Sequence, residues 1–272
     1  AALRGKKKLL GNKTPQELIQ QIQNTIVSQQ TRFEEIYQEL IRYMEEYNIY
    51  VVNETQLTEE QGRFVEDFYH ERIRPILVPI MLQYTSEFPY LRDKPIYFAV
   101  KLSKNHEPRK TRYALLDLAT EILPRFVVLP NVGNKQYIII LDDIVRYSLN
   151  DIFSFFDYDK AEAYTIKITR DAELDIDDDI SKSFMEKMSL GLEKRKRGQP
   201  VRFVYDASMP EDLLEYFKKR MRLGREDNII AGGRYHNFKD FIHFPNIGPG
   251  HFENNMKPFL PAMYLDHQKS IL

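Results

Sequence analysis

The chain contains no cysteine. This absence excludes a disulfide framework, a thiolate zinc site and a cysteine nucleophile, and it is typical of a protein of the reducing cytoplasm. Long apolar runs are also missing, because the longest candidate, Tyr137 to Leu141, is far shorter than the ~20 residues that cross a bilayer. Net charge is small, since 39 Lys and Arg stand against 40 Asp and Glu. A polyanionic partner would therefore have to bind a local patch of positive charge.

The 272 residues, 43% of them hydrophobic, suffice for one large domain or two smaller ones. At the N-terminal end, Thr14 to Glu17 form a capping box that opens a helix running to about Tyr47. One apolar stripe follows this helix: Leu18, Ile22, Ile26, Phe33, Ile36, Leu40 and Met44.

This stripe has few possible partners before residue 48, so we expect its partners upstream of Ala1. The basic start (AALRGKKKLL) and the abrupt end (DHQKSIL) also predict a piece cut from a longer protein. The alternative is a complete protein that has lost its initiator Met.

From residue 48 onward the sequence predicts many strands with few helices between them. The strand-length runs are Asn48–Asn53, Pro75–Ile80, Ile96–Leu102, Arg112–Leu118, Arg125–Pro130, Tyr137–Leu141, Ala163–Arg170 and Val201–Asp206. Helices are expected from a capping box at Thr58–Gln61 to Pro75, from Asp142 as cap to Phe153, over Asp177–Lys196, and from a capping box at Ser208–Glu211 to about Gly224. This order favours an α+β fold with a mixed or largely antiparallel sheet and packed helices, preceded by an incomplete helical bundle.

The most unusual segment is Ala231–Gly250 (AGGRYHNFKDFIHFPNIGPG). Its paired glycines permit close backbone approach, and Arg234, His236 and Lys239 are candidates for holding phosphate oxygens. The segment carries no nucleotide-binding fingerprint. The alternative is a glycine turn followed by aromatic residues that pack on the sheet, with the cations solvated or paired with carboxylates.

Other charged groups are weaker candidates. The basic clusters Lys6–Lys8, Lys194–Arg197 and Lys218–Arg222 fit solvated surfaces and helix ends better than a polyanion channel. The acidic stretch Asp171–Asp179 lacks the Gly and Glu of a calcium loop, and we expect no metal there. No metalloprotease motif or triad signature includes any of the six histidines, which are His70, His106, His236, His243, His251 and His267. The residues thus predict no self-sufficient active site.

Several segments together resemble bacterial polyphosphate kinases of the histidine-phosphoenzyme type. Gly232–Asn246 (GGRYHNFKDFIHFPN) is closely similar to a motif of that family. The further matching segments, in the same order and with similar spacing, are Ile76–Pro79, Arg112–Leu116, Pro124–Pro130, Phe155–Glu173 and Pro200–Pro210. The resemblance covers essentially the whole chain.

The resemblance implies an architecture of an N-terminal helical bundle, a head domain and two phospholipase D-like domains. By this analogy residues 1–47 are the C-terminal part of the bundle and residues 48–272 are the head domain. The phosphohistidine, a second catalytic histidine, the magnesium-binding arginines and most ATP contacts belong to the absent domains. A further ATP-contacting Asn belongs to the missing start of the bundle. We therefore expect no catalytic residue and no bound cofactor in this chain alone.

For the full-length enzyme the resemblance implies reversible transfer of the terminal phosphate of ATP to polyphosphate, with Mg²⁺. It also implies a cytoplasmic protein, with peripheral contact to the inner membrane as a further option. The head domain is expected to support dimerisation by packing against the N-terminal domain of a second copy. Arg234, His236 and Lys239 would then line the polyphosphate path or orient the neighbouring domain.

Two other functions stay open at this point. A stand-alone head domain would act as a dimerisation or polyanion-binding module without chemistry of its own. An RNA-binding protein would use the basic clusters and the aromatic residues, but the net charge is near zero and no RNP-like motif is present, so no nucleic-acid partner is expected.

Overall fold

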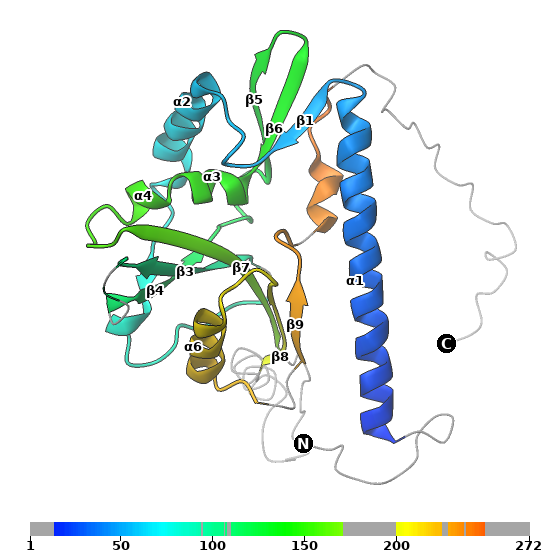
Figure 1. The fold of residues 1–272 in the computed structure, drawn as a ribbon, viewed down its shortest axis with the longest axis vertical. Helices are drawn as coiled ribbons and strands as arrows, with labels where there is room; N and C mark the ends of the chain where they lie inside the picture. Colours follow the sequence, from blue (N-terminus) through cyan, green and yellow to red (C-terminus); the bar gives the residue numbers. More distant parts are fainter. Residues whose placement is uncertain are drawn as a thin grey trace, which may run out of the picture.

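The computed structural model describes residues 14–93, 95–105, 107, 110–170, 200–224, 228–236 and 238–247. These residues form two β-sheets with helices packed around them (Figure 1). The smaller sheet has the strand order β1 (Ile49–Val52), β6 (Lys135–Ile140), β5 (Phe126–Val132). Strand β1 runs parallel to β6, and β5 runs antiparallel to it.

The larger sheet is six-stranded. Its order is β2 (Ile80–Met81), β4 (Arg112–Asp117), β3 (Tyr97–Ser103), β7 (Lys160–Arg170), β8 (Pro200–Asp206), β9 (Asn228–Gly232). Only β8 and β9 pair in parallel; the other neighbours are antiparallel. The expectation of an α+β fold with mixed sheets is therefore confirmed.

The helical elements surround these sheets. They are α1 (Pro15–Glu45), α2 (Glu59–Phe68), the π-helix η2 (Tyr69–Ile73), α3 (Leu141–Tyr147), α4 (Leu149–Ile152), α6 (Glu211–Met221) and the 3₁₀ helices η3 (Leu82–Tyr84) and η5 (Phe238–His243). None of the helices in these described ranges is long and apolar enough to cross a membrane.

The larger sheet buries residues on both faces. On one face Phe98, Val100 and Leu116 pack with α2, α3 and the smaller sheet. On the other face Ile166 and Phe203 pack against α6. Because side chains alternate along a strand, Thr165, Lys167 and Thr169 of β7 lie on the first face. Figure 1 shows α1 standing beside β9, at the end of the sheet away from β4.

Two of the three predicted capping boxes are confirmed. The side chain of Thr14 accepts a hydrogen bond from the backbone N–H of Glu17 at 3.2 Å, and the Glu17 carboxylate accepts from the backbone N–H of Thr14. Thr58 and Gln61 form the same reciprocal pair at the start of α2. These caps form because the partners lie only three residues apart, so local sequence alone determines them.

The third capping box was wrong. Ser208 donates to the carboxylate of Asp206 at 2.6 Å instead of capping a helix, and Pro210 is the N-cap residue of α6 without a side-chain hydrogen bond. Asp142 is also not a cap: α3 begins one residue earlier, after Ile140. The predicted strand at Pro75–Ile80 was wrong over most of its length, since only Ile80 pairs within the sheet. The helix predicted over 177–196 and the acidic stretch at 171–179 lie outside the described residues.

Most of the predicted apolar stripe of α1 is exposed in the described part of the chain. The exposed side chains of the stripe include Ile22, Phe33, Ile36 and Leu40. The helix contacts the rest of the described chain along one edge of the stripe, which includes Met44, and through the adjoining Tyr37. Tyr37 is buried against the rings of Tyr235 and Phe241, whose centroids lie 6.3 and 5.7 Å from its own, and Met44 is buried in an adjoining cluster.

Two glycines allow this close approach of α1 to the end of β9. A Cβ atom at Gly232 would lie 2.7 Å from the amide of Gln30 and 2.9 Å from a methyl carbon of Val204. A Cβ atom at Gly233 would lie 2.7 Å from the carboxylate of Glu34. The glycines were predicted to permit close backbone approach, and the group that approaches them is helix α1.

We expect Gly232→Ala to lower the free energy of unfolding by about 1–3 kcal/mol, because Val204 is β-branched and cannot swing away. Gly233→Ala is the matched control and should cost less than about 1 kcal/mol, because only the flexible end of Glu34 has to move. Urea unfolding followed by circular dichroism measures both values. Equal losses would contradict this account of how α1 packs.

Candidate functional site

Two adjacent carboxylates, Asp142 and Asp143, are completely buried in the first turn of α3. They lie in this turn because β6 ends at Ile140 and α3 begins at the next residue. The positive end of the helix dipole favours negative charge at this position. Burial of two charges is nevertheless expensive unless cations pair with them. The surroundings of each carboxylate supply such cations.

Asp142 pairs with Arg125, which stands just before β5. The Nη1 of Arg125 lies 2.6 Å from one carboxylate oxygen, and Nη2 donates to the other at 3.1 Å. The same Nη2 also donates to the backbone carbonyl oxygen of His236 at 3.1 Å. Burial raises the pKa of Asp142 above its ordinary value, while Arg125 and Arg146 act in the opposite direction. Arg125 thus links the smaller sheet and α3 to the segment after β9.

Asp143 is the centre of a larger group. One of its oxygens accepts hydrogen bonds from Arg146 and Arg234, each at 2.9 Å, and the other accepts from the Tyr235 hydroxyl at 2.7 Å. Arg234 also donates to Glu54 at 2.5 Å. Burial opposes the charge of Arg234, but Asp143 and Glu54 outweigh it and raise its pKa.

Arg146 extends this network to the larger sheet. It donates to the Thr165 hydroxyl at 3.0 Å and to the carbonyl oxygen of Ala163 at 3.3 Å, and its guanidinium lies 4.6 Å from the centre of the Phe98 ring. The Thr165 hydroxyl in turn donates to the carbonyl oxygen of Arg234 at 2.7 Å. We call Arg125, Asp142, Asp143, Arg146 and Arg234, with Glu54, the ionic network.

The structure separates the three residues that the sequence singled out as phosphate ligands. Arg234 is paired with two carboxylates in the ionic network. His236 is 8% exposed, and its Nε2 lies 3.1 Å from the carbonyl oxygen of Gly233. Lys239 is exposed on η5. The alternative drawn from sequence, an aromatic segment that packs on the sheet, also holds, because Phe241 and Phe244 pack on Phe126.

His236 is held in its neutral form. Burial lowers its pKa to about 4, and the nearby charges of Lys167 and Arg125 act in the same direction, whereas the Gly233 carbonyl and Asp206 act against it. Its Nδ1 is buried without a hydrogen-bond partner in the described part of the chain. At neutral pH this imidazole therefore carries no charge with which to bind an anion.

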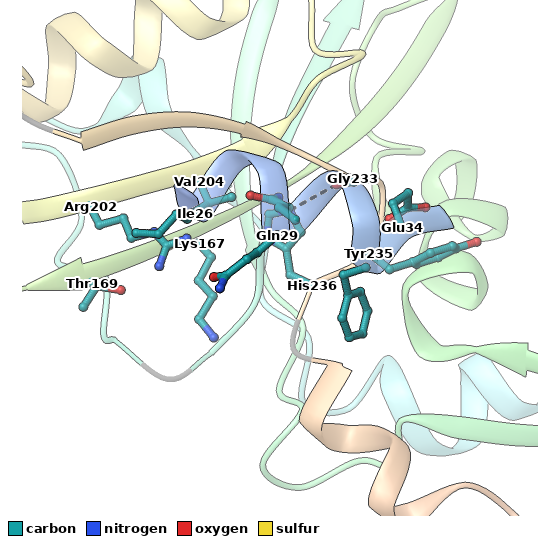
Figure 2. Close-up of a pocket in the computed structure, with 12 residues that line it drawn as sticks. Ile26, Gln29, Glu34, Lys167, Thr169, Arg202, Val204, Gly233, Tyr235 and His236 are labelled. Carbon is teal, nitrogen blue, oxygen red and sulfur yellow. Dashed lines mark hydrogen bonds between the residues drawn. The ribbon is translucent and has the colours of Figure 1, made fainter. Parts of the chain in front are cut away.

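A pocket of about 440 Å³ lies between α1 and the larger sheet (Figure 2). Lys167 and Thr169 of β7 and Arg202 of β8 line one side of it, and Figure 2 shows Gln29 of α1 beside Lys167. Glu34 and Tyr235 line the other end. Sequence reasoning did not select Lys167 or Arg202. The available signal was their alternation with apolar residues, which gives β7 and β8 a polar side.

No three or more His, Asp or Glu side chains converge as possible metal ligands within the described ranges. We therefore assign no described residue to Mg²⁺.

Comparisons with known proteins give a consistent result. Residues 60–244 match the family model for the polyphosphate kinase middle domain. Polyphosphate kinase of Vibrio vulnificus strain YJ016 is 42% identical over 264 residues, which are 95% of this chain and 37% of that protein. Polyphosphate kinase of Escherichia coli K12 is 38% identical over 259 residues, which are 94% of this chain and 37% of that protein.

A solved structure agrees with these sequences. The crystal structure of polyphosphate kinase from Porphyromonas gingivalis superposes with a TM-score of 0.67 and 27% sequence identity, covering 85% of this chain and 32% of that one. The chain thus spans about 37% of the length of the curated relatives it matches.

We expect Asp143→Asn to lower the free energy of unfolding by about 3–5 kcal/mol, because it leaves Arg146 without its anion in a buried site. Asp157→Asn removes an exposed carboxylate that pairs with Lys104, and this control should cost less than about 1 kcal/mol. Chemical unfolding of both variants tests the difference. Similar losses would show that the buried carboxylate of Asp143 contributes no more to stability than an exposed one.

His236 should make stability fall as the solution becomes more acidic. Between pH 6.5 and about 4 the unfolded chain binds a proton at His236 that the folded chain does not, so folding loses stability over this window, by about 3 kcal/mol in full. His236→Gln keeps a donor for the Gly233 carbonyl and has no such proton. Unfolding energies measured for both proteins from pH 4 to 8 should differ by a constant above pH 7 and converge below it. Parallel curves over the whole range would refute the lowered pKa.

Proposed function

Since the chain belongs to the polyphosphate kinase family, we propose that it is the middle part of an enzyme that transfers the terminal phosphate of ATP to inorganic polyphosphate. The match over residues 60–244 to the middle domain of that family supports this proposal. So does the alignment of nearly the whole chain to a little over a third of each relative. We further propose that residues 1–47 end a helical bundle and that residues 48–272 form the head domain.

The observation that carries the proposed role is the ionic network. It joins α3, both sheets and the segment after β9 through buried charges, and its arginines and carboxylates are occupied by one another. Such an arrangement fixes positions and supplies no free nucleophile. The role that fits it is a rigid support for an active site built elsewhere in the longer protein.

The chemistry itself is then assigned to the rest of the enzyme. We propose that the transfer is reversible and passes through a phosphohistidine outside this chain. Magnesium would neutralise charge on the ATP phosphates during the transfer. The proposed location is the cytoplasm, with peripheral attachment at the inner membrane.

Assembly forms a further part of the proposal. The exposed apolar row of α1, which includes Ile22, Phe33 and Leu40, supports packing against preceding helices of the bundle. We propose that the head domain then packs against the N-terminal domain of a second copy to form a homodimer. Within this assembly Arg234 and His236 orient the neighbouring domain, and Lys239, which is exposed, faces the polyphosphate path.

Labelling with radioactive ATP tests whether phosphoryl transfer takes place outside this chain. The chain alone, incubated with γ-labelled ATP and Mg²⁺, should form no phosphoenzyme, whereas the longer protein that contains it should be labelled on histidine and make polyphosphate.

A labelled histidine in the isolated chain would overturn the proposal that this part is non-catalytic. Absence of polyphosphate synthesis by the longer protein would overturn the proposed activity itself and would favour a binding module. Circular dichroism of the isolated chain serves as the control that it is folded.

A further inference from the structure

The last turn of α6 and its C-cap residue carry four cations with different surroundings. Lys218 pairs with a glutamate three residues before it. Arg220 donates to the backbone carbonyl oxygen of Thr85 at 2.8 Å and to the hydroxyl of the same residue at 3.0 Å. Lys219 and Arg222 form no ion pair in the described part of the chain. The sequence favoured a helix-end role for the whole cluster, and this role leaves Lys219 and Arg222 without partners.

The end of α6 is closed by its backbone. The N–H of Leu223 donates to the carbonyl oxygen of Lys218 at 2.9 Å, and the N–H of Arg222 donates to that of Lys219 at 3.3 Å. This pair of bonds is a Schellman motif, which places the residue after the helix in the left-handed conformation. Arg222 accordingly has a φ of 57° and a ψ of 37°. Glycine adopts this conformation at a lower steric cost, so the backbone gives no reason for an arginine there.

The side chains at this helix end line a pocket of about 490 Å³, which we call the α6 pocket. Its lining includes three cations, one carboxylate and an apolar wall: Lys219, Arg220, Arg222, Glu87, Phe88 and Met221. Two contacts hold the segment after η3 against the helix. One is the pair of hydrogen bonds from Arg220 to Thr85, and the other is the edge-on packing of Phe88 on Phe217, whose ring centroids lie 5.5 Å apart. The walls of the pocket are therefore fixed by contacts of the protein itself.

Positive charge predominates in the α6 pocket. Three cations stand against the single carboxylate of Glu87, and the Nε of Arg220 is buried without a hydrogen-bond partner among the described residues. A buried donor of this kind is costly unless water or a ligand accepts from it. Phe88 and Met221 pack on the apolar cluster beneath α6. The pocket thus lies on the α6 side of the larger sheet, and α3 with the ionic network lies on the other side (Figure 1).

We propose that the α6 pocket binds a phosphate monoester, a small organic molecule with one terminal phosphate group. At neutral pH this group carries a charge of about −2, which matches the excess of positive charge in the lining. The guanidinium of Arg222 can hold two of its oxygens, and the ammonium of Lys219 can contact the third. Phe88 and Met221 supply an apolar wall for the carbon skeleton. Glu87 repels further negative charge and so disfavours a chain of linked phosphates. The inference goes beyond the proposed function and does not depend on it.

Binding of phenyl phosphate to the 272-residue chain, followed by ligand-observed NMR, tests the proposal. We expect Arg222→Gly to weaken binding about tenfold or more, because it removes a charge-assisted contact. The same change should raise the urea concentration at the midpoint of unfolding, because glycine relieves the left-handed backbone. Weaker binding in a more stable protein cannot result from unfolding. Lys219→Gln is the second variant and should weaken binding about fivefold or more.

Lys218→Gln is the matched control, because it removes a cation from the same turn that is already paired with Glu215. It should leave the affinity for phenyl phosphate unchanged. No binding to the wild-type chain would overturn the proposal. Equal weakening by Lys218→Gln would also overturn it, because binding would then follow the total charge of the helix end.

Competition identifies the class of ligand. Orthophosphate that displaces phenyl phosphate at equal concentration would contradict the proposal, because the pocket would then bind a bare anion. Displacement by tripolyphosphate at a lower concentration than by unlabelled phenyl phosphate would also contradict it and would assign the pocket to a chain of phosphates. Polyphosphate synthesis by the longer protein is a separate measurement, so failure of the α6 pocket and failure of the proposed function are distinguishable.

Discussion

The buried carboxylate of Asp143 is the interaction on which the rest of the structure depends. It accepts hydrogen bonds from Arg146, Arg234 and Tyr235 while having no exposure to solvent of its own. An isolated charge in the protein interior would be strongly unfavourable, so the carboxylate of Asp143 is stable there only because cationic partners are buried with it. Those partners come from α3 and from the segment after β9, and Arg146 continues to β7. One charge thus links α3, the segment after β9 and, through Arg146, strand β7.

The arginines of the ionic network meet carboxylates, so little of their charge is left for a ligand. Lys167 and Arg202 stand on the adjacent strands β7 and β8 and line a pocket that Glu34 also lines.

Sequence reasoning succeeded where the determining contacts are local. The capping boxes at Thr14 and Thr58 involve residues three positions apart, and seven of the eight predicted strands follow from short apolar runs. It failed where another partner competes: Ser208 donates to Asp206, two residues before it, and Asp142 pairs with Arg125, 17 residues before it. The pairing of Arg234 with Glu54, 180 positions before it, was not predicted either. Lys167 and Arg202 could not be placed together from sequence, because they are 35 positions apart and only the register of β7 and β8 makes them neighbours.

The pairing of Glu54 with Arg234 also has a consequence for synthesis on the ribosome. The two residues are 180 positions apart, and at ordinary elongation rates the second emerges about 10 to 40 s after the first. During the first part of that interval β1 lacks β6, and throughout it α1 lacks the ring of Tyr235. Contacts of such long sequence separation form late and slow folding. The nascent N-terminal helix, with apolar side chains exposed on more than one face, is then a natural client for a chaperone until the last third of the chain arrives.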